Sequence, residues 1–203
     1  MKRFTALLAS LTLALFSSLA SAQAKFQEHK HYEDVAPQIS AKGLPKFVAG
    51  FFWYGCGHCY AFEPTLESWL EHKPADIAFS RIPAVLGRNW IPHAQAFYAT
   101  EQLGISDKTH QALFDAIHKD RKKLFAPTDI AEFLAEVSGE DAAKILMHMN
   151  AQDTHKAIAD SIDTAQKYRL RGVPSILVGG KYLVDPGAVG QELGAVIDFL
   201  LNQ

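Results

Sequence analysis

Residues 46–59 read KFVAGFFWYGCGHC and contain both cysteines of the 203-residue chain, Cys56 and Cys59. Residues 46–54 are apolar or aromatic almost throughout, as is typical of a strand buried on both faces of a sheet. From Cys59 onward the apolar side chains recur with the period of a helix, and Pro64 is expected to kink that helix. The stretch therefore predicts a strand, a turn holding two cysteines, and a helix in direct succession.

The rest of the chain predicts helices placed between two groups of strands. Residues 77–82 alternate as a strand, whereas 175–178 and 181–184 flank a Gly-Gly turn and predict a hairpin. A last helix carries Val189, Leu193 and Leu200 on one face. Helical periodicity between these strands covers residues 93–103, 107–119, 128–137, 139–149 and 153–169. This order predicts an α/β domain with a helical insertion at about residues 90–168.

The first residues predict an export signal. Lys2 and Arg3 precede an uncharged apolar run at 4–16, and small residues then offer cleavage after Ala22 or Ala24. The run is shorter than the ~20 residues of a transmembrane helix, which disfavours membrane insertion. We therefore expect a signal peptide at 1–22 and a single exported domain at 23–203. The formal net charge of −2 gives no reason to expect binding to nucleic acid.

The two cysteines permit four interpretations. A structural disulfide would close a very short loop, and half of a zinc site would need a second histidine beyond His72 at finger-like spacing, which the chain lacks. Two inert core thiols are disfavoured by their place at a helix start. A redox-active dithiol, with a Cys56–Cys59 disulfide as its oxidised form, fits strand–CxxC–helix in an exported chain. A non-catalytic module that senses redox state or binds metal remains the alternative.

The expected place of the pair assigns each cysteine a role. At the first turn of a helix, Cys56 meets unpaired backbone N–H groups and the positive end of the helix dipole, which favour its thiolate. Cys59 lies one turn further in and is expected to stay protonated, so that Cys56 attacks and Cys59 resolves the mixed disulfide. His58 is expected to lower the pKa of Cys56 further. The alternative for His58 is an exposed histidine without a role.

The motif FFWYGCGHCY (51–60) with Phe62-Glu63, together with RGVPS (171–175) and GKY (180–182), resembles the DsbA family of periplasmic thiol:disulfide oxidoreductases. The resemblance implies a thioredoxin fold with an inserted helical domain and a monomer that needs no cofactor or metal. It also implies an oxidase that donates its disulfide to newly exported proteins bearing cysteines. A quinone-linked membrane oxidase of the DsbB type would reoxidise it. The alternative is a disulfide isomerase or reductase with the same centre.

The resemblance also implies roles for the second motif. Pro174 would follow a cis peptide bond and pack against the cysteines, and its loop would offer backbone groups to an incoming substrate chain. Val173, the residue before this proline, is similar to the oxidase branch of the family. The isomerase branch usually has threonine at the same position.

Two positions depart from the family pattern. Gly57 stands where these proteins commonly have proline, and glycine leaves the helix start freer. Gly50 stands where many relatives have a buried carboxylate beneath the resolving cysteine. Proton transfer to Cys59 then needs another group or water, for which Glu63 is the candidate. The alternative for Glu63 is an ordinary solvated carboxylate on a helix.

Overall fold

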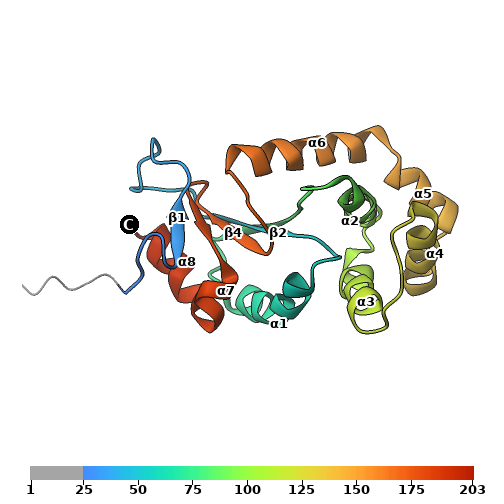
Figure 1. The fold of residues 1–203 in the computed structure, drawn as a ribbon, viewed down its shortest axis with the longest axis horizontal. Coiled ribbons are helices and arrows are strands. Elements are labelled where there is room, and N and C mark those ends of the chain that lie inside the picture. Colours follow the sequence, from blue (N-terminus) through green and yellow to red (C-terminus); the bar gives the residue numbers. More distant parts are fainter. Residues whose placement is uncertain (1–24) are drawn as a thin grey trace, which may run out of the picture.

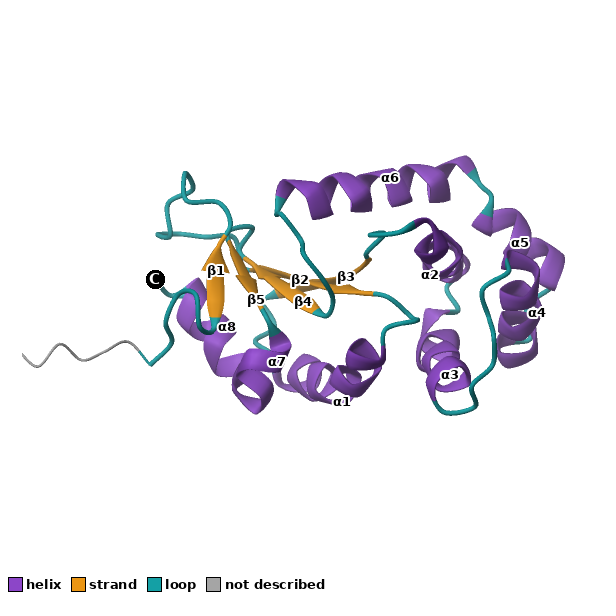
Figure 2. Ribbon diagram, in the orientation of Figure 1, coloured by secondary structure: helices purple, strands orange, loops and turns teal. Residues whose placement is uncertain are grey.

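The computed structural model describes residues 25–203 (Figure 1). The expected signal peptide at 1–22, with its cleavage sites, lies outside the described residues. Within them the protein is a five-stranded sheet with helices on both faces, and more helices gather beyond one end of the sheet (Figure 2).

The sheet has the strand order β1-β5-β4-β2-β3. At its centre, β2 (Phe47–Phe52) runs parallel to β3 (Ala78–Pro83) and antiparallel to β4 (Ser175–Val178). The hairpin partner β5 (Tyr182–Val184) and the edge strand β1 (Tyr32–Asp34) complete it. The predicted strands at 46–54, 77–82, 175–178 and 181–184 are thus confirmed, with small shifts at their ends.

Strand β1 was not predicted from the sequence. It has three residues, all partly exposed, and pairs with β5 only, so Tyr32 lies opposite Val184. A short polar edge strand lacks the apolar alternation by which a strand is recognised.

The helices divide into three groups. Helices α1 (Gly57–His72), α7 (Pro186–Val189) and α8 (Leu193–Leu201) lie on one face of the sheet, whereas α6 (Gln152–Lys167) lies above the other (Figure 1). The remaining helices gather beyond the end of the sheet and are α2 (Ile91–Leu103), α3 (Ser106–His118), α4 (Pro127–Ser138) and α5 (Ala142–Met149). Helices α2–α6 follow β3 and precede β4 in the chain, where the helical insertion was expected.

The prediction of one continuous last helix is wrong. Val189 ends the short helix α7, a 3-10 turn (Gly190–Glu192) follows, and α8 begins only at Leu193. Gly190 has a φ of 51°, which interrupts helical geometry and is a conformation that glycine adopts at little cost. The apolar period continues across this break because α7 and α8 both cover the same core, which includes Val189, Leu193 and Leu200.

Residues of β2 connect the sheet core to the helical insertion. Val48 packs with the core on the α1 and α8 face, whereas Phe51 packs on the opposite face. Phe52, Tyr54 and Cys59 belong to the core of the insertion, where they join buried residues of α2 to α5. The turn between β2 and α1 therefore lies where the two parts of the domain meet.

Candidate active site

The sulfur of Cys56 caps the N-terminus of α1. Cys56 has an extended backbone, and its Sγ accepts a hydrogen bond from the backbone N–H of Cys59 at 3.2 Å. The backbone N–H of Cys56 donates to the carbonyl of Trp53 at 2.9 Å, which closes the turn after β2. The first turn of α1 contains no acidic residue that would oppose a negative charge.

These contacts favour the Cys56 thiolate. The hydrogen bond from the Cys59 side chain is the largest cause that lowers the pKa of Cys56 to about 6; partial burial opposes it. The backbone N–H groups of Cys59 and His58, and the charge of His58, lower the pKa further in the same direction.

Cys59 is the buried member of the pair. Its residue is 1% exposed, and both cysteines are free thiols, so the structure is that of the reduced pair. The hydrogen bond to Cys56 raises the pKa of Cys59 strongly, and burial raises it as well. The pair thus combines an outer sulfur that ionises easily with an inner sulfur that keeps its proton, in the arrangement predicted from the spacing.

The loop before β4 contacts the outer sulfur. The Val173–Pro174 peptide bond is cis, in the form that the resemblance implies. The Cys56 thiol donates to the carbonyl of Val173 at 3.4 Å, although 117 residues separate the two in the chain. Ser175 donates its hydroxyl to the carbonyl of Gly172 at 2.8 Å, which fixes the turn that leads into β4.

A groove of about 810 Å³ lies beside this loop. Its lining includes His58 and Phe62 of α1, the Val173–Pro174 loop, and the segment 183–188 that joins β5 to α7. His58 is exposed at the start of α1, so its ring faces the groove rather than the core. The groove thus runs beside His58, the neighbour of Cys56 in the chain, and beside Val173, whose carbonyl contacts Cys56 Sγ.

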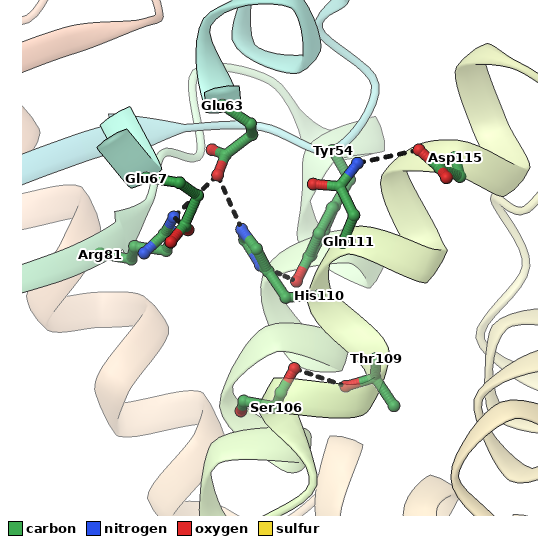
Figure 3. Close-up of polar contacts among 9 residues, drawn as sticks. All are labelled: Tyr54, Glu63, Glu67, Arg81, Ser106, Thr109, His110, Gln111 and Asp115. Carbon is green, nitrogen blue, oxygen red and sulfur yellow. Dashed lines mark hydrogen bonds and ion pairs between the residues drawn. The ribbon is translucent and has the colours of Figure 1, made fainter. Parts of the chain in front are cut away.

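Glu63 lies beneath the cysteine pair and is buried, with 3% of its surface exposed. Its interpretation as a solvated carboxylate is therefore wrong. Its Oε2 accepts from Arg81 Nη2 at 2.7 Å and lies 3.5 Å from His110 Nε2 (Figure 3). Arg81 of β3 also contacts Glu67, one turn further along α1.

Arg81 and His110 keep Glu63 ionised in spite of its burial. Burial raises the pKa of Glu63, but the polar contact with His110 Nε2 and the charge of Arg81 outweigh it and hold the pKa below its ordinary value. In return, Glu63 is the main cause that raises the pKa of Arg81. The three side chains form one coupled group beneath the cysteines.

A small cavity joins this group to Cys59. It measures about 10 Å³, close to the room that one water molecule needs, and Gly50, Cys59, Glu63 and Arg81 are among its lining residues. Gly50 pairs with Arg81 in the parallel β2–β3 ladder. Gly50, which has no carboxylate to offer, thus lines the same cavity as the carboxylate of Glu63 from α1.

Arg81 and His110 were not predicted as site residues. Arg81 lies in a strand whose sequence shows alternation only, and His110 is one of nine histidines without a shared spacing. Their partners come from other elements, so no local pattern marks them. Sequence identifies the cysteine pair because Cys56 and Cys59 lie close together in one motif of the chain.

The described residues offer neither a cluster of metal-binding side chains nor a helix that could cross a membrane. They contain no group of three or more histidine, cysteine, aspartate or glutamate side chains placed to hold a metal ion. Within residues 25–203, no helix is both long and apolar enough to cross a membrane.

Comparison with known proteins places the chain in a family. The DSBA-like thioredoxin domain matches residues 75–194. A thiol:disulfide interchange protein DsbA of Pseudomonas aeruginosa is 36% identical over 200 residues, which cover 97% of this chain and 94% of that protein. The protein of the same name from Burkholderia cepacia is 37% identical and is covered over 96% of its length.

Solved structures agree with this comparison. The crystal structure of Pseudomonas aeruginosa DsbA has a TM-score of 0.74 at 38% identity, covering 84% of this chain and 89% of that one. The oxidoreductase DsbA from Xylella fastidiosa has a TM-score of 0.73 at 29% identity, covering 85% and 93%. The chain therefore has the thioredoxin fold with an inserted helical domain, and it belongs to the DsbA family of thiol:disulfide oxidoreductases.

Proposed function

We propose that this protein is a periplasmic disulfide oxidase that donates a Cys56–Cys59 disulfide to newly exported proteins bearing cysteines. The observation that carries the proposal is the place of Cys56 Sγ at the N-terminus of α1, 3.2 Å from the backbone nitrogen of the buried Cys59. This arrangement lowers the pKa of Cys56 to about 6 and raises that of Cys59. A stabilised thiolate stabilises the reduced protein, and this makes the disulfide a better oxidant.

The reaction proceeds by two exchanges. A substrate thiolate attacks Cys56 Sγ, the Cys56–Cys59 bond breaks, and Cys59 leaves as a thiolate that takes up a proton. A second substrate thiolate attacks the substrate sulfur of this mixed disulfide, and Cys56 leaves as a thiolate. Two electrons pass from the substrate to the cysteine pair. One of the two substrate protons ends on Cys59 and the other in solvent.

We assign the proton transfer at Cys59 to Glu63. Its carboxylate and the Cys59 thiol line the same small cavity, and a water molecule there would bridge them. When the disulfide is remade, the same route takes the proton away from Cys59, so that its sulfur can attack.

The Val173–Pro174 loop and the groove beside it are assigned to substrate binding. The carbonyl of Val173 already faces Cys56 Sγ, so an extended chain bound along this loop would present its cysteine to the outer sulfur. Reoxidation by a quinone-linked membrane oxidase of the DsbB type would use the same exposed sulfur. A monomer is sufficient for this cycle because every assigned group comes from one chain.

A redox titration of the pair against reduced and oxidised glutathione tests the proposal. Known proteins range from about −270 mV for thioredoxin through about −180 mV for protein disulfide isomerase to about −120 mV for DsbA itself. We expect a potential above about −180 mV. A potential near that of thioredoxin would contradict the oxidase proposal and favour the reductase alternative.

Replacing His58 with serine tests its role in tuning Cys56. His58 is exposed, and its charge is the smallest of the causes that lower the pKa of Cys56. We therefore expect the pKa to rise by less than about one pH unit and the potential to fall by less than about 30 mV. Thiolate absorbance of the reduced protein measures this.

The control for His58→Ser is His72→Ser at the other end of α1, where the ring contacts the carbonyl of Ser68. That variant should leave the pKa of Cys56 unchanged. An unchanged titration in His58→Ser as well would show that His58 has no tuning role.

A further inference from the structure

His110 of α3 reaches from the helical insertion into the buried group around Glu63. Its ring packs edge-on against Phe52 and Phe114, with ring centroids 5.3 Å away in each case. Its Nδ1 lies 2.8 Å from the hydroxyl of Tyr54, and its Nε2 lies 3.5 Å from Glu63 Oε2 (Figure 3). An apolar, aromatic pocket thus fixes a ring whose two nitrogens face two different polar groups.

The contacts with Tyr54 and Glu63 together favour a hydrogen on Nε2. Burial is the main cause that raises the pKa of Tyr54 far above its ordinary value, so its phenol keeps its hydrogen. When this O–H donates to Nδ1, the ring carries its hydrogen on Nε2, where it faces Glu63. The other tautomer would turn a nitrogen lone pair toward the Glu63 carboxylate, which is repulsive.

The Nε2–H group has no other use in the described part of the chain. It is buried and has no hydrogen-bond partner at ordinary distance there, and Glu63 Oε2 is the acceptor that it faces. Arg81 holds the same oxygen from the β3 side at 2.7 Å. Arg81 thus holds Oε2 by a hydrogen bond, and His110 Nε2 faces the same oxygen from the α3 side at 3.5 Å, so both groups favour one orientation of the carboxylate beside the Cys59 cavity.

We propose that His110 is a positioning residue for disulfide exchange, because its Nε2–H orients the Glu63 carboxylate and keeps it ionised for proton transfer at Cys59. The proposal rests on the role assigned to Glu63 under the proposed function. His110 does not line the cavity, so it acts through Glu63 and not on the sulfur directly. The helical insertion would thereby supply a group to the exchange chemistry, in addition to covering the site.

Other ionisable groups surround His110 and enter its pH dependence. Tyr54 and Glu63 contact His110 directly, and Arg81, which also pairs with Glu67, lies on the other side of Glu63. Glu101 of α2 acts on Tyr54, and Asp107 lies one turn before His110 in α3. Among them, Glu63 is the carboxylate that His110 Nε2 faces directly. A change at His110 should therefore act mainly on the ionisation of Glu63.

The test compares two amide replacements of similar polarity. In His110→Gln, the amide nitrogen reaches the position of Nε2 and can donate to Glu63. In His110→Asn, the shorter amide reaches only the position of Nδ1, so it can pair with Tyr54 but not with Glu63. Neither amide titrates, so a difference between the two variants reports the donor to Glu63 and not a charge on residue 110.

The reaction to follow is the release of glutathione from a Cys56–glutathione mixed disulfide, formed by reaction of the reduced protein with oxidised glutathione. Cys59 gives up its proton, its sulfur attacks Cys56 Sγ, and the Cys56–glutathione bond breaks with glutathione leaving as a thiolate. The rate of this step is measured between about pH 3 and pH 8. The fall of this rate at low pH, its acid limb, should report the protonation of the Glu63 carboxylate.

We expect the wild type and His110→Gln to share one profile, and His110→Asn to have its acid limb about one pH unit higher. On that limb, His110→Asn should be about tenfold slower. The pKa of Cys56, from thiolate absorbance, should stay at about 6 in both variants because His110 does not contact Cys56. A wild-type profile in His110→Asn, equal shifts in both variants, or a changed pKa of Cys56 would each overturn the proposal.

Glu63→Gln separates this proposal from the proposed function. This variant should lose the acid limb altogether. If the limb remains, Glu63 is not the proton-transfer group and the role of His110 fails with it. The glutathione redox equilibrium of the wild type still decides independently whether the protein is an oxidase.

Discussion

Cys59→Ser is expected to trap substrates as mixed disulfides, whereas Cys56→Ser is expected to abolish disulfide transfer completely. The exposed side of the pair belongs to Cys56, whose Sγ faces the Val173 carbonyl, and Cys59 is 1% exposed. A substrate can therefore reach only the outer sulfur. Without Cys59 no internal thiol can release the substrate that is bound to Cys56.

Non-reducing electrophoresis of each variant after incubation with a reduced, unfolded substrate protein measures this. Adducts should accumulate with Cys59→Ser, be absent with Cys56→Ser, and disappear on reduction. Equal trapping by the two variants would contradict the assignment of attacking and resolving sulfurs. The double variant is the control for adducts that do not involve either cysteine.

Arg81→Leu is expected to lower the free energy of unfolding by about 3–5 kcal/mol, because it leaves the buried Glu63 carboxylate without its main cation. For a chain of this length each kcal/mol changes Tm by about 2–4 °C, so the loss should be roughly 10 °C. Replacing Lys46, whose ion pair with Asp76 is more than half exposed on both sides, is the control and should cost less than about 1 kcal/mol.

The stability that Arg81→Leu loses relative to the wild type should be greater at neutral pH than in acid. In the wild type the pKa of Glu63 is depressed, so its stabilisation is present above the ordinary carboxyl pKa and is lost as pH falls through the folded value. Without Arg81, only His110 opposes the effect of burial, so the pKa of Glu63 should rise. The stability deficit should then be largest near pH 7 and shrink as Glu63 is protonated on acidification.

The double variant Arg81→Leu with Glu63→Leu completes this experiment. Removal of both charges should recover most of the lost stability, because the cost lies in the uncompensated charge and not in the loss of the pair itself. A double variant as unstable as Arg81→Leu would contradict this explanation and indicate that packing of the arginine side chain is the main contribution.

Sequence predicts the elements of this fold well where their apolar side chains form a clear pattern. The buried strand β2 was recognised as an unbroken apolar run, and helix α4 because its apolar residues recur with the helical period. Strand β1 escaped prediction because its pairing with β5 depends on a segment about 150 residues away. The break at Gly190 was missed because a continuous apolar face conceals it.

For the site, the sequence predicts the groups that are local in the chain. The roles proposed for Cys56 and Cys59 depend on a two-residue spacing at a helix start, and in the structure Cys56 caps α1 with Cys59 in its first turn. For Glu63 the sequence left two interpretations open, a proton-transfer group and a solvated carboxylate, because its contacts with Arg81 in β3 and His110 in α3 cannot be seen in the sequence. Contacts between distant elements are what a single sequence does not reveal.

The oxidase proposal requires that the Cys56 thiolate stabilise the reduced protein. In the chain-entropy picture, closing the short Cys56–Cys59 loop favours the oxidised form by about 2 kcal/mol at every pH. A pKa of about 6 in the folded protein, against about 8.5 in the unfolded chain, favours the reduced form by at most about 1.4 kcal/mol at pH 7. Partial exposure of the sulfur and screening by salt reduce that gain.

The sign follows from a depressed acid pKa. The gain of the reduced form is complete above the unfolded value, partial at neutral pH, and lost as pH falls through about 6. The two contributions are therefore nearly equal at neutral pH, and they cross at about pH 7.5 when screening is neglected.

Paired measurements of the free energy of unfolding of the oxidised and reduced proteins, from about pH 4 to pH 9, test this claim most directly. We predict that the oxidised form is more stable in acid, that its advantage shrinks as pH rises above about 6, and that the reduced form is the more stable one by about pH 8–9. A difference between the two forms that stays constant across this range would contradict a stabilised Cys56 thiolate and, with it, the oxidase proposal.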